Sequence, residues 1–340
     1  MSSNHFENLP GAVGSPPQHY GNPLGEQRLL AEGKAVVSLA DRGVITVSGP
    51  DRLSWLDSLT SQSLTKLQPG ESTETLQLDP TGRVEFAIRV VDDGETAWLL
   101  VDGSETAALL SWLTKMRFML RVEITDVSDQ YTTIGSLGLP VTNAVVVWND
   151  PWNAVTRGGH QYSGRTDYDW SYSESLVERV ETQPAAGTIA LEALRIAAWR
   201  PRLATEVDER SIPHELDWLR SAVHLSKGCY RGQETVAKVH NLGHPPRRLV
   251  MLHLDGATPQ PGTPVMLGDA EVGRVTSAAM HYELGPIALA VVKRSVDPAA
   301  ALVVTVDGDA VAAAQEVIVP TDAGAEANVP RLPRLGAVTR

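Results

Sequence analysis

The stretch KGCYRGQETVAKVHNLGHPPRRL, residues 227–249, joins a thiol, two nearby glycines, a helical pattern and a turn that precedes a change in composition. It holds Cys229, the only cysteine of the 340-residue chain. Lys227 and Arg231 stand two positions away on either side, and positive charge nearby favours the reactive thiolate form. The helix expected to follow would favour an anion just upstream of its first N–H groups. A lone cysteine also suits a small buried apolar position, so the residues leave both interpretations open.

Downstream of this stretch the sequence predicts strands without helices. RRLVMLHLDG, GTPVMLGDAEVGRVTSAAM, GPIALAVVKR and ALVVTV are apolar runs separated by Gly and Pro turns. Several such strands in a short span predict a small closed barrel. We therefore expect a domain boundary at GHPPRR and a C-terminal β-barrel domain over residues 247–319.

Upstream, strands and helices mix without the regular alternation of a parallel βαβ protein. Residues 35–49, AVVSLADRGVITVSG, predict two short strands around a turn, and residues 74–102 alternate apolar and polar positions as an antiparallel meander does. Capping residues and apolar spacing predict helices over 48–62, 104–118 and 188–200. The fold class is therefore α+β, with residues 25–246 forming two interleaved α+β subdomains that divide near 130–185.

Composition limits the class of protein. The formal net charge is −12, with no basic block, which argues against direct binding of nucleic acid. No run reaches the ~18 apolar residues of a membrane span, and the N-terminal segment lacks the apolar core of a secretory signal, so we expect a cytoplasmic protein with no membrane partner. Residues 1–24 are rich in Pro, Gly, Asn and His, residues 320–340 are rich in Pro, Ala and Gly, and both are expected to be mobile tails. One cysteine cannot hold an iron–sulfur cluster and the histidine spacing suits no metal, so no intrinsic metal is expected.

The opening stretch resembles the signature of the YgfZ family, which reads Lys-Gly-Cys-Tyr/Phe-x-Gly-Gln-Glu before an apolar helix and a basic pair. Stretches 45–70, 190–216 and 273–294 are similar to other segments of the same family. Every fixed position of the motif is matched, by Lys227, Gly228, Cys229, Tyr230, Gly232, Gln233 and Glu234.

The broader relatives of that family are the aminomethyltransferase T-proteins of glycine cleavage and folate-dependent demethylating enzymes. The resemblance implies a three-domain T-protein fold around a central channel that holds tetrahydrofolate or a related reduced folate. It also implies a role in supporting iron–sulfur client enzymes or cluster-assembly proteins, some of them linked to tRNA modification. Cys229 would be the working thiol and Lys227 its cationic neighbour.

The resemblance also suggests folate contacts. Arg195 matches an arginine of the family's folate half and would pair with a folate carboxylate, while Glu192, one helical turn earlier, would either orient it or lie on a solvated helix face. Tyr168 and Asp169 fall near the position of a pterin-binding acid in relatives, or belong to a plain polar loop.

One departure from the catalytic relatives bears on the reaction. T-proteins carry an Asp-Asp pair on a strand similar to GRVEFAIRVV, and the matching positions here are Phe86 and Ala87. Without a carboxylate there, no group at that position can move a proton at the transferred carbon. We therefore expect an accessory protein. The alternatives are a folate-dependent aminomethyltransferase or demethylase, and a folate-binding scaffold in which Cys229 is inert.

Overall fold

The protein is described by a computed structural model that covers residues 4–165, 170–181 and 183–327. Its helices are α1 (Asn4–Glu7), α2 (Pro23–Ala31), α3 (Arg52–Leu59), α4 (Thr106–Met116), α5 (Thr188–Ala197), α6 (Leu203–Glu206), α7 (Leu219–Ala222) and α8 (Gln233–Leu242), with 3-10 turns at Gly103–Glu105, Pro151–Asn153 and Pro213–Leu216. Its strands are β1 (Val36–Ser38), β2 (Arg42–Ser48), β3 (Ser72–Leu78), β4 (Val84–Asp92), β5 (Thr96–Asp102), β6 (Glu123–Asp126), β7 (Thr132–Leu137), β8 (Ala144–Asn149), β9 (Tyr172–Val177), β10 (Ala185–Ala186), β11 (Arg247–Leu254), β12 (Pro264–Leu267), β13 (Ala270–His281), β14 (Gly285–Lys293), β15 (Leu302–Val306) and β16 (Asp309–Val317).

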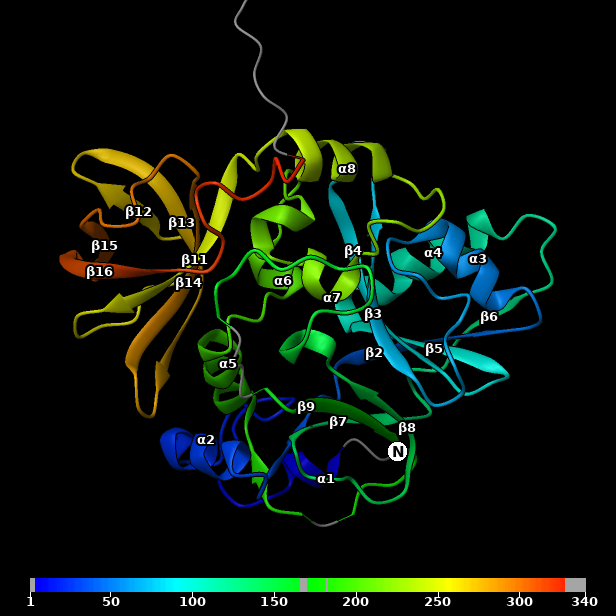
Figure 1. Cartoon of the computed structure of the whole chain (residues 1–340). Helices are drawn as coiled ribbons and strands as arrows, with labels where there is room; N and C mark the ends of the chain where they lie inside the picture. Colours follow the sequence, from blue (N-terminus) through cyan, green and yellow to red (C-terminus); the bar gives the residue numbers. More distant parts are fainter. Residues whose placement is uncertain (1–3, 166–169, 182, 328–340) are drawn as a thin grey trace, which may run out of the picture.

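These strands form three groups. One sheet has the order β3-β4-β5-β2-β6, a second has the order β10-β1-β7-β9-β8, and β11 to β16 close into a barrel. Figure 1 shows the barrel on the left, the first sheet with α3 and α4 on the right, and the second sheet with α1 and α2 at the bottom. The helices α5, α6 and α7 lie between the three groups (Figure 1).

The first sheet contains the meander expected over 74–102. β3 pairs antiparallel with β4, and β4 pairs antiparallel with β5. Its alternating apolar residues face α3 and α4 on one side, where Ile45, Leu56, Leu99 and Leu109 are fully or almost fully buried. Because strands present successive side chains to opposite faces, the other side of the same sheet faces the centre of the molecule.

The two strands expected over 35–49 are present, but they belong to different sheets. β1 pairs with β7 and β10 in the second sheet, whereas β2 pairs with β5 and β6 in the first. A tight turn closed by the hydrogen bond from Arg42 N to Leu39 O at 2.9 Å separates them. The chain therefore crosses from one sheet to the other at this turn, beside the space that the two sheets enclose.

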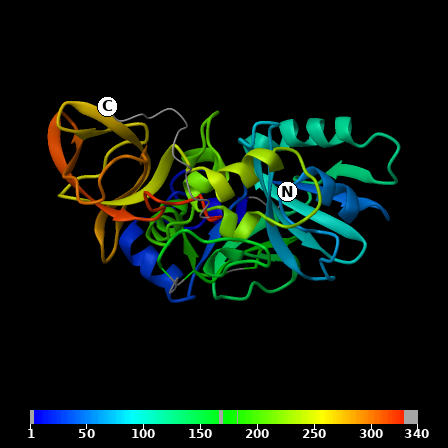
Figure 2. The same cartoon turned by 45° about the horizontal axis from the view of Figure 1, so that its top comes forward.

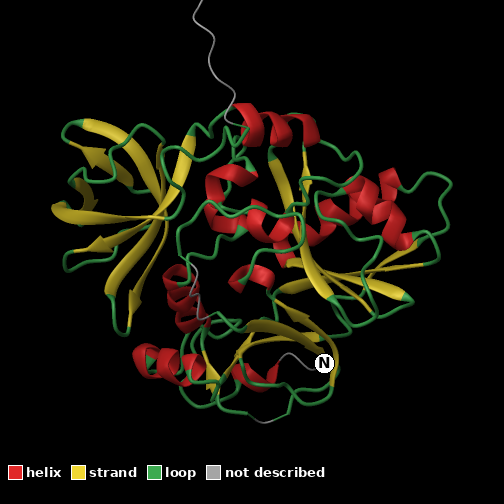
Figure 3. Ribbon diagram, in the orientation of Figure 1, coloured by secondary structure: helices red, strands yellow, loops and turns green. Residues whose placement is uncertain are grey.

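The barrel expected downstream of GHPPRR is confirmed. β11 pairs with both β14 and β16, which closes the ring of strands, and Figure 3 shows the strands packed without a helix among them. Val250, Leu252, Val265 and Leu289 are buried within or against it. Closure leaves no open sheet edge in this part of the chain.

Residues 4–24, expected to be a mobile tail, pack against the body of the protein instead. Phe6 is fully buried. The carbonyls of Pro17 and Gln18 accept hydrogen bonds from the N–H groups of Thr188 and Ile189, at 3.0 and 3.1 Å. The first N–H groups of a helix have no partner within it, and here the N-terminal segment supplies acceptors for those of α5.

The start of the second expected tail is packed as well. The N–H groups of Ala325, Glu326 and Ala327 donate to carbonyl oxygens in the last turn of α8, at 3.4, 2.9 and 3.2 Å. The last carbonyls of a helix also lack partners within it, so residues 325–327 complete the hydrogen bonding of α8. Composition did not reveal either contact, because both use backbone groups of segments far away in the sequence.

The expected α+β fold with a C-terminal barrel is therefore confirmed. Among the helices that the structure describes, none combines the length and the apolar character that a membrane crossing requires.

Candidate functional site: a central cavity and a separate cysteine loop

A cavity of about 650 Å³ lies between the two sheets and α5. Residues from both sheets, α5 and the N-terminal segment contribute to its walls. Those that the argument below uses are Arg42, Ala87, Arg89, Glu105, Trp170, Tyr172, Glu174, Glu192, Arg195 and Arg202.

Glu174, on β9, is the centre of a charged cluster in one wall. It is fully buried, and its Oε1 accepts hydrogen bonds from Arg42 Nη2 at 2.8 Å and from the Tyr172 hydroxyl at 3.0 Å. Arg89 Nε lies 3.2 Å from the same oxygen. Burial acts to raise the pKa of Glu174, but the two guanidinium groups outweigh burial and hold that pKa below its usual value. The cavity wall therefore contains an ionised carboxylate between two cations.

Arg89 keeps donors that the described residues do not use. Its Nη1 lies 3.9 Å from Asp102 Oδ1 and its guanidinium lies over the Trp148 ring, 5.5 Å from the centroid. Its buried Nε is paired with Glu174 by charge at 3.2 Å, but that contact lacks hydrogen-bond geometry, and Nε makes no hydrogen bond within the described part of the chain. Burial and the neighbouring Arg42 lower the pKa of Arg89, although arginine stays protonated at physiological pH. Arg89 can therefore donate to a carboxylate or carbonyl oxygen of a ligand in the cavity.

Arg195 also lines the cavity, but its donors are occupied. Its Nε and Nη2 donate to the Glu192 carboxylate at 3.0 and 2.6 Å, and Nη2 also donates to Ser277 Oγ at 2.8 Å. Its Nη1 donates to Glu206 Oε2 at 2.9 Å and to the Arg200 carbonyl at 2.5 Å. A guanidinium has five N–H donors, so none is left for a folate carboxylate. Arg195 ties α5 to α6 and to barrel strand β13.

Glu192 orients Arg195, as their spacing of one helical turn suggested. Burial opposes ionisation, but attraction to Arg195 and their paired hydrogen bonds lower the pKa of Glu192 to about 2. Arg202 Nη1 adds a contact at 3.6 Å. Glu192 lines the cavity as an ionised, paired carboxylate, which is not the solvated helix face that we kept as the alternative.

The positions of the missing acidic pair have distinct surroundings. Ala87 lines the cavity, whereas Phe86 points the other way and packs with the core between the first sheet and α3. Glu85 is exposed and lies outside the cavity lining; it accepts a hydrogen bond from Gln77 Nε2 at 2.7 Å. The cavity therefore presents a methyl group where the catalytic relatives are expected to present a carboxylate.

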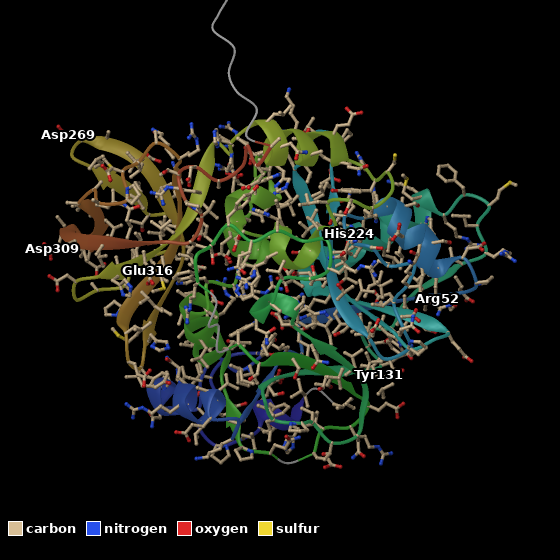
Figure 4. All side chains as sticks on the ribbon, viewed as in Figure 1. Arg52, Tyr131, His224, Asp269, Asp309 and Glu316 are labelled. Atoms are coloured by element: carbon tan, nitrogen blue, oxygen red, sulfur yellow. The ribbon has the colours of Figure 1, made fainter. Side chains whose placement is uncertain are left out.

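Cys229 lies on a surface loop and is exposed. The loop begins after His224, labelled in Figure 4, whose N–H donates to the Ser61 carbonyl at 3.0 Å. The Lys227 side chain is bound elsewhere: its Nζ donates to the carbonyls of Asp57, Thr60 and Gln62 at 2.5, 2.9 and 2.7 Å. These carbonyls end α3 or follow it, so Lys227 anchors the loop to the C-terminal end of that helix.

Other motif residues also hold the loop. Gln233 Nε2 donates to the Lys227 carbonyl at 3.3 Å, and the buried Tyr230 ring lies 5.3 Å from Lys227 Nζ. Burial raises the pKa of the Tyr230 hydroxyl. Glu234 is exposed in the first turn of α8, where a carboxylate suits the helix dipole.

The two glycines of the motif differ. Gly232 has φ +84°, and a Cβ there would lie 2.7 Å from the Asp79 carbonyl, because the turn between β3 and β4 touches this point. Gly82 of that turn would in the same way meet Thr235, with a Cβ distance of 2.8 Å. Gly228 has open space around it. Gly232 is therefore required by packing, whereas Gly228 leaves room beside Cys229.

The cysteine loop and the cavity are separate features. The residues that line the cavity do not include Cys229, so the thiol lies outside the cavity. Arg231 lies near Glu85, at 3.9 Å, and is partly exposed. Tyr168 and Asp169 lie outside the described residues.

Sequence reasoning missed Arg42, Arg89 and Glu174. Arg89 is a charged residue in a strand whose neighbours are largely apolar, EFAIRVV, whereas Arg42 follows Asp41 at the start of its strand and Glu174 lies between two serines. Charged residues are rarely buried unless paired, so a charge inside an apolar strand was a signal for an internal polar cluster. Their mutual contact could not be inferred, because they come from three strands of two sheets.

Comparison with known proteins agrees with this architecture. Residues 19–146 match the family described as the GCVT N-terminal domain, and residues 247–321 match the glycine cleavage T-protein C-terminal barrel domain. The two matches together cover more than half of the chain.

Relatives with names include the tRNA-modifying protein YgfZ of Vibrio vulnificus, 27% identical over 67% of this chain and 72% of its own length. The mitochondrial iron–sulfur cluster assembly factor IBA57 homolog of Mycosarcoma maydis is 26% identical over 64% of this chain and 57% of its own length. A chloroplast protein of Arabidopsis thaliana named as a transferase is 27% identical over 75% of this chain. The chain spans 65% of that plant protein, less than two thirds of its length.

The fold has a solved counterpart in aminomethyltransferase T of the glycine cleavage system from Bartonella henselae. The TM-score is 0.71, over 93% of this chain and 95% of that chain, at 18% sequence identity. At this identity the likeness concerns the fold, which is the T-protein fold that the motif implied. The two domain matches show that the chain belongs to the family built from the GCVT N-terminal domain and the T-protein C-terminal barrel domain, and the named relatives fit the YgfZ branch of that family.

Proposed function

We propose that this protein binds a reduced folate in the central cavity and supports the assembly or repair of iron–sulfur clusters in client enzymes, with Cys229 as the thiol that meets the client. The main support for the proposal is the fixed conformation of the cysteine loop. Cys229 is exposed, while Lys227, Tyr230, Gly232 and Gln233 hold the loop in place. A cysteine thiolate is a good ligand for iron, so a fixed, exposed thiol suits transient contact with a client's cluster.

The residues around the cavity fit a reduced folate. Its volume of about 650 Å³ lies within the ~300–1,000 Å³ of ordinary ligand sites. Trp170 and Tyr172, stacked with centroids 5.1 Å apart, supply aromatic surface for a ring system. The unused donors of Arg89, and the buried Arg42 Nε and Glu174 Oε2 that lack partners among the described residues, supply polar groups.

Bound tetrahydrofolate would supply a carrier for a one-carbon unit. The part of this chain would be to hold it: Arg89 would donate to an acceptor oxygen, and Trp170 and Tyr172 would cover its ring. Arg195 and Glu192 would contribute indirectly, by fixing α5 against the barrel beside the ligand.

The alternative is a folate-dependent aminomethyltransferase or demethylase. Such an enzyme needs an acid–base group beside the transferred carbon, and Ala87 cannot supply one. Glu105 is one of the cavity carboxylates that a transferase could use instead. It lines the cavity, and burial raises its pKa against the influence of Arg89 and Arg42. Turnover that Glu105→Gln abolishes would therefore favour the alternative.

The folate part is tested by calorimetric titration with tetrahydrofolate. Arg89→Leu should weaken binding by roughly 10- to 100-fold, since a hydrogen bond to a charged group contributes ~1.5–3 kcal/mol. Arg83→Leu is the matched control, because Arg83 is exposed on the turn that leads into the same strand. Absence of saturable binding by the wild-type protein would remove folate from the proposal.

The iron–sulfur part is tested in cells that lack the native gene. Iron–sulfur enzymes whose activity falls on deletion are measured after the wild-type or the Cys229→Ser gene is restored. Because the thiol is exposed, the serine variant should keep its stability and its folate affinity while failing to restore those enzymes. Full restoration by Cys229→Ser would make the motif structural and would overturn the role of the thiol.

A further inference from the structure

The loop between α4 and β6 presents two large apolar side chains to solvent. Phe118 is 80% exposed and Met119 is 97% exposed. Single exposed apolar residues are common on proteins, but two adjacent large ones at almost full exposure are typical of a contact site. We call Phe118 and Met119 the apolar knob.

The knob stands on a fixed base. Asp51 accepts hydrogen bonds from Arg121 N, Nε and Nη2 at 2.9, 3.0 and 2.6 Å. Trp55 Nε1 donates to the Met116 carbonyl at 3.1 Å on the other side of the loop. The knob is therefore held between two anchored positions, 116 and 121.

Two features of the backbone also indicate that this loop is a contact site. Phe118 has φ 47°, a left-handed conformation that is uncommon for a bulky residue. Gly49 lacks the Cβ that would clash with the Arg121 carbonyl, so the loop can close tightly on β2. Strained backbone that the surroundings maintain is often found at binding sites. Here the left-handed residue carries an apolar ring that is exposed to solvent.

The rim of the knob is basic on an acidic protein. The segment 115–121, KMRFMLR, contains Lys115 and Arg117, while its third cation, Arg121, is paired with Asp51. The rim therefore has two unpaired positive charges within the described residues, although the whole chain has a net charge of −12. Such a rim attracts a carboxylate-bearing surface and repels a basic one. The complementary surface is an apolar pocket bordered by Asp or Glu side chains.

The knob and the cysteine loop lie at opposite ends of one short helix. Asp51, which caps the start of α3, and Trp55, in its middle, hold the knob, whereas Lys227 binds carbonyls at and after the end of α3. The eight residues of α3 span about 12 Å at 1.5 Å per residue. Figures 1 and 2 show both loops on the α3 side of α8. A standard interface buries about 800 Å² per partner, which is wide enough to cover both.

We infer that the apolar knob docks into an acid-rimmed apolar pocket of the iron–sulfur client, and that this contact places the client opposite Cys229. This inference rests on the proposed function, since it names how the partner of the thiol site is held. A protein partner is favoured over an anionic membrane, because the −12 chain would be repelled by the membrane surface outside the small basic rim.

The test combines Phe118→Ser with Met119→Ser in the full-length chain. The matched control combines Met280→Ser with Leu284→Ser, an apolar pair 43% and 45% exposed on the β13–β14 hairpin of the barrel. In cells lacking the native gene, the knob variant should fail to restore the dependent iron–sulfur enzymes, and the control should restore them. The knob variant should unfold at the wild-type temperature, because its exchanged side chains are almost fully exposed, and both variants should bind tetrahydrofolate normally.

A photo-crosslinking residue, p-benzoylphenylalanine, placed at position 119 identifies the partner. It should form an adduct with one of the enzymes whose activity depends on this gene, and Cys229→Ser should leave that adduct in place. An adduct with a second copy of the chain, or binding of the purified protein to vesicles of phosphatidylcholine and phosphatidylglycerol that the knob variant loses, would overturn the inference.

The docking role of the apolar knob and the client-binding role of Cys229 can be contradicted independently of each other. If Cys229→Ser abolishes the dependent activities and the knob variant restores them fully, the docking role falls and the thiol role stands. If Cys229→Ser restores them and the knob variant does not, the thiol role falls and the assignment of a client opposite Cys229 falls with it.

Discussion

Lys227 Nζ lies 3.3 Å from Asp57 Oδ2, within an arrangement that directs the lysine into the end of α3 and away from the neighbouring cysteine. Burial lowers the pKa of Lys227, and Asp57 opposes that effect. Lys227 therefore anchors the cysteine loop. Its removal should first make that loop less ordered.

Lys227→Met keeps most of the side-chain volume and removes the three donors. Leaving buried carbonyls without a partner costs about 1–3 kcal/mol each where water cannot replace the donor. We expect a loss of roughly that size in the free energy of unfolding and faster hydrogen exchange over residues 223–232. Lys238→Met on the exposed side of α8 is the control and should change neither. Unchanged exchange in Lys227→Met would contradict the anchoring role.

Substitutions of Gly228 and Gly232 should distinguish a role in packing from a role in partner access. Gly232→Ala places a Cβ against the Asp79 carbonyl at a positive φ, so we expect a destabilisation of about 1–3 kcal/mol. Gly228→Ala meets no neighbour and should leave stability unchanged while reducing restoration of the client enzymes, because the methyl group stands beside the exposed thiol. Denaturant unfolding and the cell assay measure the two effects. Equal stability of both variants would contradict the packing argument.

Arg195→Ala should lower the free energy of unfolding as well as the affinity for the ligand. It leaves Glu206 fully buried without its cation, and removal of one partner of a buried ion pair costs ~3–5 kcal/mol. Arg202→Ala is a control in the same wall: Arg202 is partly exposed with one 3.6 Å ion contact, so its loss should cost about 1 kcal/mol or less. Chemical denaturation compares them. A stable Arg195→Ala protein that only loses folate affinity would restore the direct contact that the sequence suggested.

The sequence predicted the elements better than their assembly. The barrel strands follow from local alternation and turn residues, and these signals are complete within 247–317. β1 and β2 were equally visible as strands, yet nothing local indicated that a turn at Leu39–Arg42 sends them into different sheets. That outcome depends on which distant strands they meet.

The site residues show the same limit. Cys229 and Gly232 were recognisable from the motif. The position of Lys227 two residues before Cys229, however, does not reveal where the lysine side chain points. Lys227 is two positions from Cys229 in sequence and binds α3 in space. Arg195 was placed correctly beside the cavity, while its five internal hydrogen bonds depend on Glu206 and Ser277, which only the folded chain brings to it.

Asp217 makes stability depend on pH in a way that one substitution can isolate. It is fully buried at φ 55°, and its Oδ1 accepts a hydrogen bond from Tyr162 N at 2.6 Å. Burial raises the pKa of Asp217 to about 7, against the effects of that hydrogen bond and of Arg220. An aspartate in an unfolded chain has a pKa of about 4. Between these values the folded state holds a proton that the unfolded state has lost.

The stabilisation linked to this proton is therefore complete below pH ~4 and is lost as the pH rises through about 7. Asp217→Asn keeps the acceptor for Tyr162 N, tolerates the left-handed backbone and cannot ionise. Relative to this variant, the wild-type protein should lose on the order of 4 kcal/mol of unfolding free energy between pH 4 and pH 8, at ~1.4 kcal/mol per pKa unit. Subtracting the variant's curve removes the contribution of other titrating groups, such as Glu192, whose lowered pKa acts with the opposite sign at acidic pH. Denaturant unfolding of both proteins across this range measures the difference, and parallel curves would mean that Asp217 is ionised in the folded protein at neutral pH.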